Sequence, residues 1–87
     1  MAVVTGQITL SSTPVQIDGT SYNPFKLYVH NASASDSIYI GGDNTVSATT
    51  GFDLHSKSTL TLELPPLSSI WVMSPNGSPT INWMKVD

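Results

Sequence analysis

The stretch Ile38-Tyr39-Ile40-Gly41-Gly42-Asp43 lies at the centre of the pattern that decides the fold. Apolar side chains alternate with others in this stretch, and a pair of glycines then ends the run. The same period of two recurs on both sides, in residues 25–30 and 59–64. A period of two buries one face of a strand and leaves the other face wet, which is typical of antiparallel sheets packed face to face. The sequence therefore predicts a small all-β protein.

The alternating segments predict about seven strands, separated by turn signals at the spacing expected of a sandwich. We expect them at residues 7–11, 15–17, 25–30, 37–41, 59–64, 69–73 and 80–86. The last segment is ambiguous, because Ile81 and Trp83 share one side while Met84 and Val86 share the other. We expect a bulge there, or burial on both faces. The prediction is an antiparallel β-sandwich or barrel-like domain that spans residues 1–87, with residues 1–6 as an extended N-terminal arm.

The alternation weakens between Asp43 and Lys57, where Val46, Phe52 and Leu54 are the expected apolar anchors. So long an excursion in a small domain is typical of a packed functional loop. Irregular segments on a rigid scaffold commonly supply binding residues. We therefore expect the part from Asp43 to His55 to be the main contact surface.

Charged residues are few, with three lysines, no arginine, six acids and a net charge of −3. This composition lacks the basic patch of a nucleic-acid-binding protein. Serine and threonine together supply 23 of the 87 residues, and cysteine is absent. A small domain without disulfides often gains stability from a partner, so we expect oligomerisation or docking. No apolar stretch approaches the roughly 20 residues that span a bilayer, and the first residues do not resemble a secretory signal, so we expect no membrane partner.

Motifs for catalysis or for a cofactor are missing from the sequence. A Gly-x-Ser-x-Gly nucleophile elbow is absent, and Gly41-Gly42 lacks the further glycine and the lysine of a phosphate loop. The candidate metal ligands lack metal-site spacing; they are His30, His55, Asp36, Asp43 and Asp53. Asn31-Ala32-Ser33 and Asn76-Gly77-Ser78 match the glycosylation pattern but are more simply turn residues. We expect no enzyme, no metal and no cofactor.

From Phe25 to Val86 the chain resembles small virion structural proteins of tailed bacteriophages, in particular capsid decoration (cement) proteins. The segments that carry this resemblance are a strand closed by Asn31, then Ile38 to Gly42, residues 46–54, residues 60–64, and the pair 70–73 and 81–86. The upstream hairpin at residues 7–17 fits the same layout. The Pro65-Pro66 pair and the bulky Trp71 and Trp83 depart from it, which leaves the shape of the late sheet edge open.

The resemblance implies a protein that binds the outer surface of a phage head and bridges neighbouring subunits of the major capsid protein. It also implies a homo-oligomer, most often a trimer, on the capsid surface of the virion and in the host cytoplasm during assembly. Two other interpretations stay open. One is a carbohydrate-binding or host-adhesion module, in which Trp71 and Tyr39 stack on sugar rings. The other is a tail, neck or fibre component of the virion.

The candidate interface residues are of two kinds. Exposed aromatic side chains make good interface anchors, because each buries a large area at low entropic cost. Alternation places three aromatic residues on outward faces, although such rings can equally cover a second layer of the protein's own core. The loop adds two polar residues and one aromatic. The set is Tyr28, Tyr39, Trp71, Asp43, Asn44 and Phe52.

Overall fold

The computed structural model describes residues 3–17, 21–75 and 77–87, and these fold into eight strands in two antiparallel four-stranded sheets. The strands are β1 (Val3–Thr9), β2 (Val15–Gln16), β3 (Phe25–Asn31), β4 (Ile38–Gly41), β5 (Phe52–Leu54), β6 (Thr59–Leu64), β7 (Trp71–Met73) and β8 (Thr80–Val86). The predicted all-β sandwich is confirmed.

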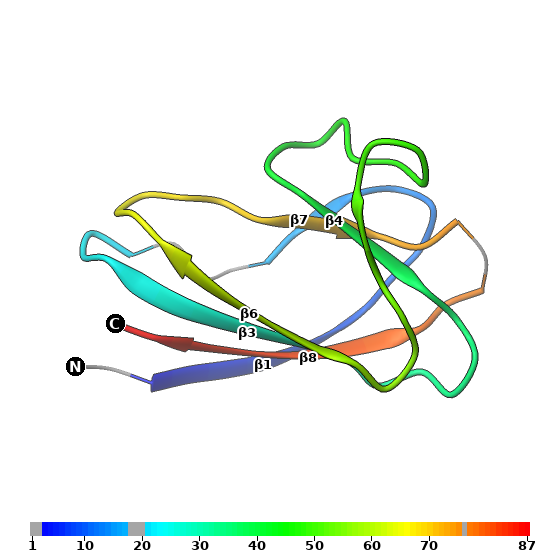
Figure 1. Cartoon of the computed structure of the whole chain (residues 1–87), viewed down its shortest axis with the longest axis horizontal. Coiled ribbons are helices and arrows are strands. Elements are labelled where there is room, and N and C mark those ends of the chain that lie inside the picture. Colours follow the sequence, from blue (N-terminus) through cyan, green and yellow to red (C-terminus); the bar gives the residue numbers. More distant parts are fainter. Residues whose placement is uncertain (1–2, 18–20, 76) are drawn as a thin grey trace.

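The strand order is β1-β8-β3-β6 in one sheet and β2-β7-β4-β5 in the other (Figure 1). The first strand therefore pairs with the last, the second with the seventh, the third with the sixth and the fourth with the fifth. Eight strands rolled up in this nested order form a jelly roll. Val3 pairs with Val86, so both ends of the described chain lie together at one end of the sandwich (Figure 1).

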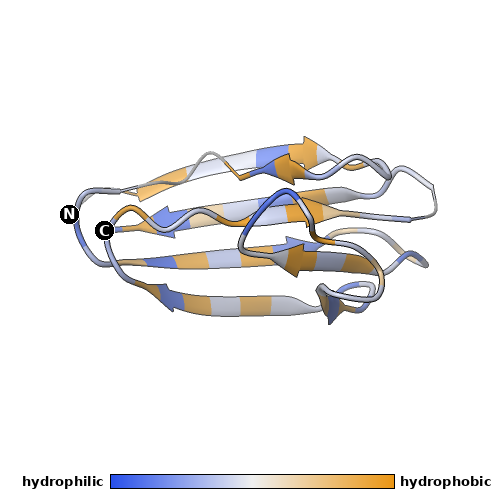
Figure 2. Ribbon diagram, turned by 90° about the horizontal axis from the view of Figure 1, so that it is seen from above, coloured by the Kyte–Doolittle hydropathy of each residue, from blue (hydrophilic) through white to orange (hydrophobic). Residues whose placement is uncertain are grey.

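The core lies between the two sheets and is built from alternate residues of each strand. In β3, Leu27 and Val29 are at most 1% exposed, whereas the alternating Tyr28 and His30 are half-buried. Hydrophobic and hydrophilic bands alternate along the strands in the same way (Figure 2). The buried cluster contains Leu10, Ile17, Phe25, Leu27, Val29, Ile38, Ile40, Leu54, Val72, Ile81 and Trp83. The inward positions predicted for β3 and β4 are confirmed.

Strand β8 keeps an unbroken register with both of its neighbours, so the expected bulge is wrong. The alternative expectation for this strand, burial on both faces, fits the structure better. Ile81 and Trp83 are buried between the sheets, while Met84 and Val86 are half-buried on the outside. Because β8 lies between β1 and β3, side chains from both neighbours flank its outer face.

Several strand ends differ from the sequence prediction by one or two residues, and two differences are larger. The strand count is eight and not seven, because Phe52–Leu54 forms β5 against β4. Three residues are too few to show an alternation that can be recognised in sequence. Residues 3–6, expected as part of an extended arm, instead form the first half of β1, since pairing with β8 satisfies their backbone groups. Residues 1–2 lie outside the described part.

Gly6 allows a close contact inside β1. It pairs with Trp83, and a Cβ atom built on Gly6 would lie 2.7 Å from the indole ring. Real Cβ atoms do not approach other atoms so closely, so a larger residue at this position would displace the ring. The missing side chain of Gly6 thus makes room for the bulkiest member of the core.

Asn31, at the end of β3, is the buried polar residue that joins the strands to their connections. It is 0% exposed, and its Nδ2 donates to the carbonyl oxygens of Asp36 (2.8 Å) and Leu54 (3.1 Å). Its Oδ1 accepts from the backbone N–H of Ser33 at 3.0 Å. A side chain held in this way cannot carry a glycan, which agrees with its prediction as a turn residue. Asn76, the other match to the glycosylation pattern, lies outside the described residues.

Replacing Asn31 by alanine should lower the free energy of unfolding by about 2–4 kcal/mol, because it leaves buried backbone groups without partners. Chemical denaturation followed by circular dichroism measures the change. Asn44→Ala is the matched control, because Asn44 is exposed, and it should change stability little. Equal stability of the two variants would contradict the role given to Asn31.

Candidate functional site

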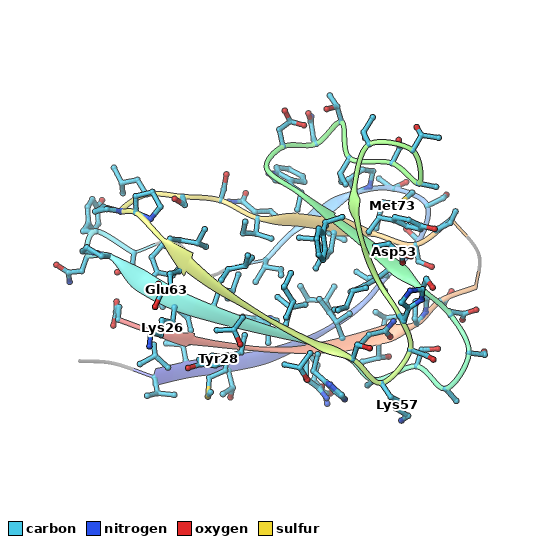
Figure 3. The ribbon with its side chains drawn as sticks, in the orientation of Figure 1. Lys26, Tyr28, Asp53, Lys57, Glu63 and Met73 are labelled. Carbon is cyan, nitrogen blue, oxygen red and sulfur yellow. The ribbon has the colours of Figure 1, made fainter. Side chains whose placement is uncertain are left out.

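The outer face of the β1-β8-β3-β6 sheet gathers side chains from four strands. Pairing places Thr5, Met84, Tyr28 and Thr61 in one row, and Gln7, Asn82, His30 and Thr59 in the next. We call these eight residues the Tyr28 face. Tyr28 lies on the side of the lower sheet that points away from β4 and β7 (Figure 3). The described chain leaves this side of the sheet uncovered (Figure 1).

The sheet is hollowed on both sides of Tyr28. A hollow of about 570 Å³ is lined by Thr5, Gly6, Gln7, Tyr28, His30, Asn82, Trp83 and Met84. A second, of about 640 Å³, also includes Tyr28 and extends toward the sheet end past Lys26, Glu63 and Val86. The ring of Tyr28 therefore separates two open depressions, each large enough to receive side chains from a partner.

The first hollow has a mainly apolar lining with a few polar groups, and no lysine or carboxylate is among its described lining residues. The Oδ1 atom of Asn82 is buried and has no hydrogen-bond partner. A buried acceptor without a partner is costly, so a rotation of the Asn82 side chain that turned Oδ1 toward a donor of a bound molecule would gain free energy. Nearby, Nδ1 of His30 and the hydroxyl of Thr59 are 2.9 Å apart. This arrangement suits binding to a neutral, hydrogen-bonding surface.

The second hollow contains the exposed ion pair between Lys26 and Glu63, whose Nζ and Oε1 atoms are 3.8 Å apart. The two side chains lie side by side near one end of the sheet (Figure 3). An exposed pair of this kind contributes little to stability. Asp87 lines the same hollow, and its Oδ2 accepts from the Ser21 hydroxyl at 2.6 Å, so acidic residues outnumber the lysine among the described residues of this hollow.

The opposite sheet presents Tyr39 and Trp71, and this face is partly covered by the protein itself. Tyr39 shares a row with Met73 and Asp53, and Trp71 shares the next row with Gln16 and Gly41. Figure 3 shows Met73 and Asp53 in the upper layer. Both predicted aromatics are half-buried, as expected if such rings cover a second layer of the core.

The loop between β4 and β5 provides this cover. Val46 is only 6% exposed, and it fills the space beside Gly41, where an added Cβ would lie 2.8 Å from the side chain of Val46. The loop also turns on itself, because the N–H groups of Thr50 and Gly51 both donate to the carbonyl of Ser47. The expectation that this excursion is packed is confirmed, with Val46 and Leu54 as buried anchors. Phe52, the third expected anchor, is instead 61% exposed because it begins an edge strand.

Asp43 closes the first turn of the loop. Its Oδ1 accepts from the backbone N–H of Thr45 at 2.9 Å and also from the Thr45 hydroxyl. The hydroxyl bond first, and then the backbone bond, hold the pKa of the Asp43 carboxyl below its usual value of 3.8. Hydrogen bonds to a carboxylate favour its charged form. Asn44, next in the chain, is exposed. Asp43 thus has a structural role, because it closes the turn with which the β4–β5 loop begins.

The structure divides the predicted site residues between two faces. Tyr28 lies on one outer face, whereas Tyr39 and Trp71 are diagonal neighbours on the other. Asp43 and Asn44 belong to the β4–β5 loop, and Phe52 is the first residue of β5. Sequence reasoning missed Gln7 and Asn82 as partners of Tyr28. Alternation marks them as outward residues, but only the strand order brings them together.

Among the described residues, no three His, Cys, Asp or Glu side chains gather closely enough to hold a metal ion. Nε2 of His55 lies 3.6 Å from Oδ2 of Asp53, and both side chains are substantially exposed. Within the same described ranges, no helix is long and apolar enough to cross a membrane.

Comparison with known proteins gives a structural likeness without a family. No protein-family model matches the chain, and no curated protein sequence matches it. A solved structure described as "Bacillus endospore appendages form a novel family of disulfide-linked pili" is similar to it, with a TM-score of 0.65 and 14% sequence identity. The similarity covers 97% of this chain and 83% of the other. At this identity the likeness supports the fold alone.

Replacing Thr45 by valine should raise the pKa of Asp43 toward 3.8, because it removes the hydroxyl donor and keeps the N–H. A carboxyl carbon NMR titration measures this pKa. The lowered pKa contributes stability above pH 3.8, and this contribution is lost as the pH falls through the folded-state pKa. Thr49→Val is the control, since the Thr49 hydroxyl contacts Ser47 instead. An unchanged Asp43 pKa in Thr45→Val would rule out the hydroxyl as its cause.

Proposed function

We propose that this protein is a virion structural protein of the capsid decoration type, which binds the outside of a bacteriophage head through its Tyr28 face. The observation that carries the proposal is the Tyr28 face, which is hollowed on both sides of one aromatic ring and whose eight residues include no lysine and no carboxylate. Aromatic anchors set among uncharged polar side chains are typical of protein interfaces.

The chemistry of this face favours contact with another protein. Asn82 offers a buried acceptor without a partner, and Met84 and Tyr28 offer apolar area next to it. A capsid surface can supply both a hydrogen-bond donor and apolar side chains. Charge is confined to the second hollow, where Lys26, Glu63 and Asp87 lie at the sheet end, so electrostatic steering has no part in binding at the first hollow.

The fold is compatible with the proposal but does not establish it. Jelly rolls occur in viral capsid proteins and in lectins, and one fold can serve many functions. The structural neighbour is described as forming pili, which are protein assemblies. That neighbour supports the broader form of the proposal, a building block that acts by contact with other chains. Its disulfide linkage has no counterpart here, since this sequence has no cysteine.

The mechanism is adhesion. When the Tyr28 face covers a joint between neighbouring capsid subunits, separating those subunits also breaks the new contact. A protein that binds the assembled shell and not the loose subunits stabilises the shell by mass action. A homo-oligomer, for which a trimer is the expected form, multiplies the contacts with the major capsid protein.

Tyr28→Ala should weaken binding to heads of the virus that encodes the chain roughly tenfold or more, because it removes the central aromatic anchor. Co-sedimentation with heads that lack the protein measures the binding, and thermal disruption of the shell measures the reinforcement. Tyr22→Ala is the matched control, because Tyr22 is 87% exposed and lies outside the Tyr28 face.

Circular dichroism separates loss of binding from loss of fold in these variants. The proposal predicts that Tyr22→Ala binds heads and reinforces them like the unchanged protein. Failure of the unchanged protein to bind any head, or full binding by a folded Tyr28→Ala variant, would contradict it. Density for the protein on a tail, neck or fibre would keep the virion assignment and reject the head surface.

A carbohydrate-binding or host-adhesion module is the second candidate. The observation that favours it is the diagonal placement of Tyr39 and Trp71 on one outer face, where two rings can stack on a sugar. In that case Trp71→Ala should abolish binding to glycans in an array, whereas Tyr28→Ala should leave that binding unchanged. Capsid binding that depends on Tyr28, without glycan binding, would exclude this candidate.

A further inference from the structure

The four sheet edges of this sandwich differ in length. In the β2-β7-β4-β5 sheet, the edge strands are only two and three residues long. In the β1-β8-β3-β6 sheet, the edge strands are seven and six residues long. Very short edge strands are one way in which proteins prevent edge-to-edge pairing. One sheet has this protection and the other does not.

The two long edges also lack the usual chemical protection. Strand β1 contains no charged residue and no proline, and Val3 and Val4 are 59% and 41% exposed. Strand β6 has Glu63 as its single charged residue, and Pro65 follows the strand without interrupting it. Lysines, prolines and bulges normally block such edges. These edges are thus suited to pairing with another strand.

The direction of the backbone groups on β1 follows from one hydrogen bond. The N–H of Leu10 donates to the carbonyl of Pro79, at the end of the β1–β8 ladder. Backbone groups alternate in direction along a strand, so even-numbered residues of β1 face β8. The N–H and C=O groups of Thr5 and Gln7, like those of Val3 and Thr9, therefore point away from the sheet.

The same reasoning applies to β6. The N–H of Asn31 donates to the carbonyl of Ser58, so Ser58 and the leucines of β6 face β3. The backbone groups of Thr59, Thr61 and Glu63 point outward. Each long edge thus presents a row of donors and acceptors at every second residue, flanked by threonine side chains.

The two edges match in direction as well. Every neighbouring pair in β1-β8-β3-β6 is antiparallel, so β6 runs opposite to β1. A second copy moved sideways across the sheet, without being turned over, places its β1 antiparallel to β6 of the first copy. In an antiparallel sheet with an even number of strands, the two edge strands always run in opposite directions, so this antiparallel match needs no further adjustment.

We propose that β6 of one copy pairs with β1 of a second copy of this chain, so that the sheet continues from subunit to subunit. A second copy fits because its free edge has the required direction, a similar length and no acid to repel Glu63. The contact is head-to-tail, so it produces a ring when the rotation between copies closes and a filament when it does not. This proposal holds whether or not the protein binds a capsid.

Two proline variants test the pairing by removing one outward donor from each edge. Gln7→Pro changes β1 and Thr61→Pro changes β6, and proline at an outward-facing edge position keeps the internal ladder. The unchanged protein should form rings or filaments in analytical ultracentrifugation as its concentration rises. Each variant alone should be monomeric, because every contact needs one intact β1 and one intact β6.

Mixing the two variants gives the decisive result. The Gln7→Pro protein keeps a usable β6, and the Thr61→Pro protein keeps a usable β1, so an equal mixture should form one-to-one heterodimers and nothing larger. Ala48→Pro is the proline control and should assemble like the unchanged protein. Ala48 occupies the second position of the Ser47–Thr50 turn, where proline is well tolerated.

Circular dichroism establishes that each variant is folded. If Gln7→Pro does not fold, the double variant Thr5→Lys with Gln7→Lys replaces it, since it keeps every backbone donor and places charges along the edge. Three results would overturn the proposal: a monomer at all concentrations, a dimer lost in the β1 variant but unaffected by Thr61→Pro, or assembly that survives both changes.

Discussion

Burial of one apolar face from each of two four-stranded sheets is the interaction on which this molecule depends. The residues that meet between the sheets, such as Val29, Ile38, Val72 and Ile81, are completely shielded from water. The chain has no cysteine, so no disulfide supplements this contact. Gly6 supports this contact because it has no side chain and so leaves space for the ring of Trp83. Asn31 supports it by hydrogen bonding to backbone groups where strands end.

Once the inner faces are used for the core, the outer faces can serve other purposes, and here they differ. The β2-β7-β4-β5 sheet is partly covered by the protein's own loop, in which Val46 is buried beside Gly41. The β1-β8-β3-β6 sheet has no such cover in the described chain and is hollowed around Tyr28. The difference between the faces is the structural basis for placing a partner on the Tyr28 face.

The edges repeat this contrast. Nested pairing brings the longest strands, β1, β3, β6 and β8, into one sheet, and leaves the shorter β2, β4, β5 and β7 in the other. The sheet with the uncovered face is therefore also the sheet with long edges. The two proposed contacts are compatible, because side chains of the Tyr28 face serve the first and edge backbone groups serve the second.

The sequence by itself determined the fold class, the inward faces of β3, β4 and β6, and the packed character of the β4–β5 loop. These features follow from local alternation and from single anchors such as Val46, which can be recognised without knowing what lies next to them. Only the tertiary structure decided the strand order, the short β5 and the place of residues 3–6 in β1. It also separated Tyr28 from Tyr39 and Trp71, and joined it to Gln7 and Asn82. The physical reason is that local alternation defines which side of each strand faces solvent, whereas long-range strand pairing decides which of these solvent-facing sides form one surface.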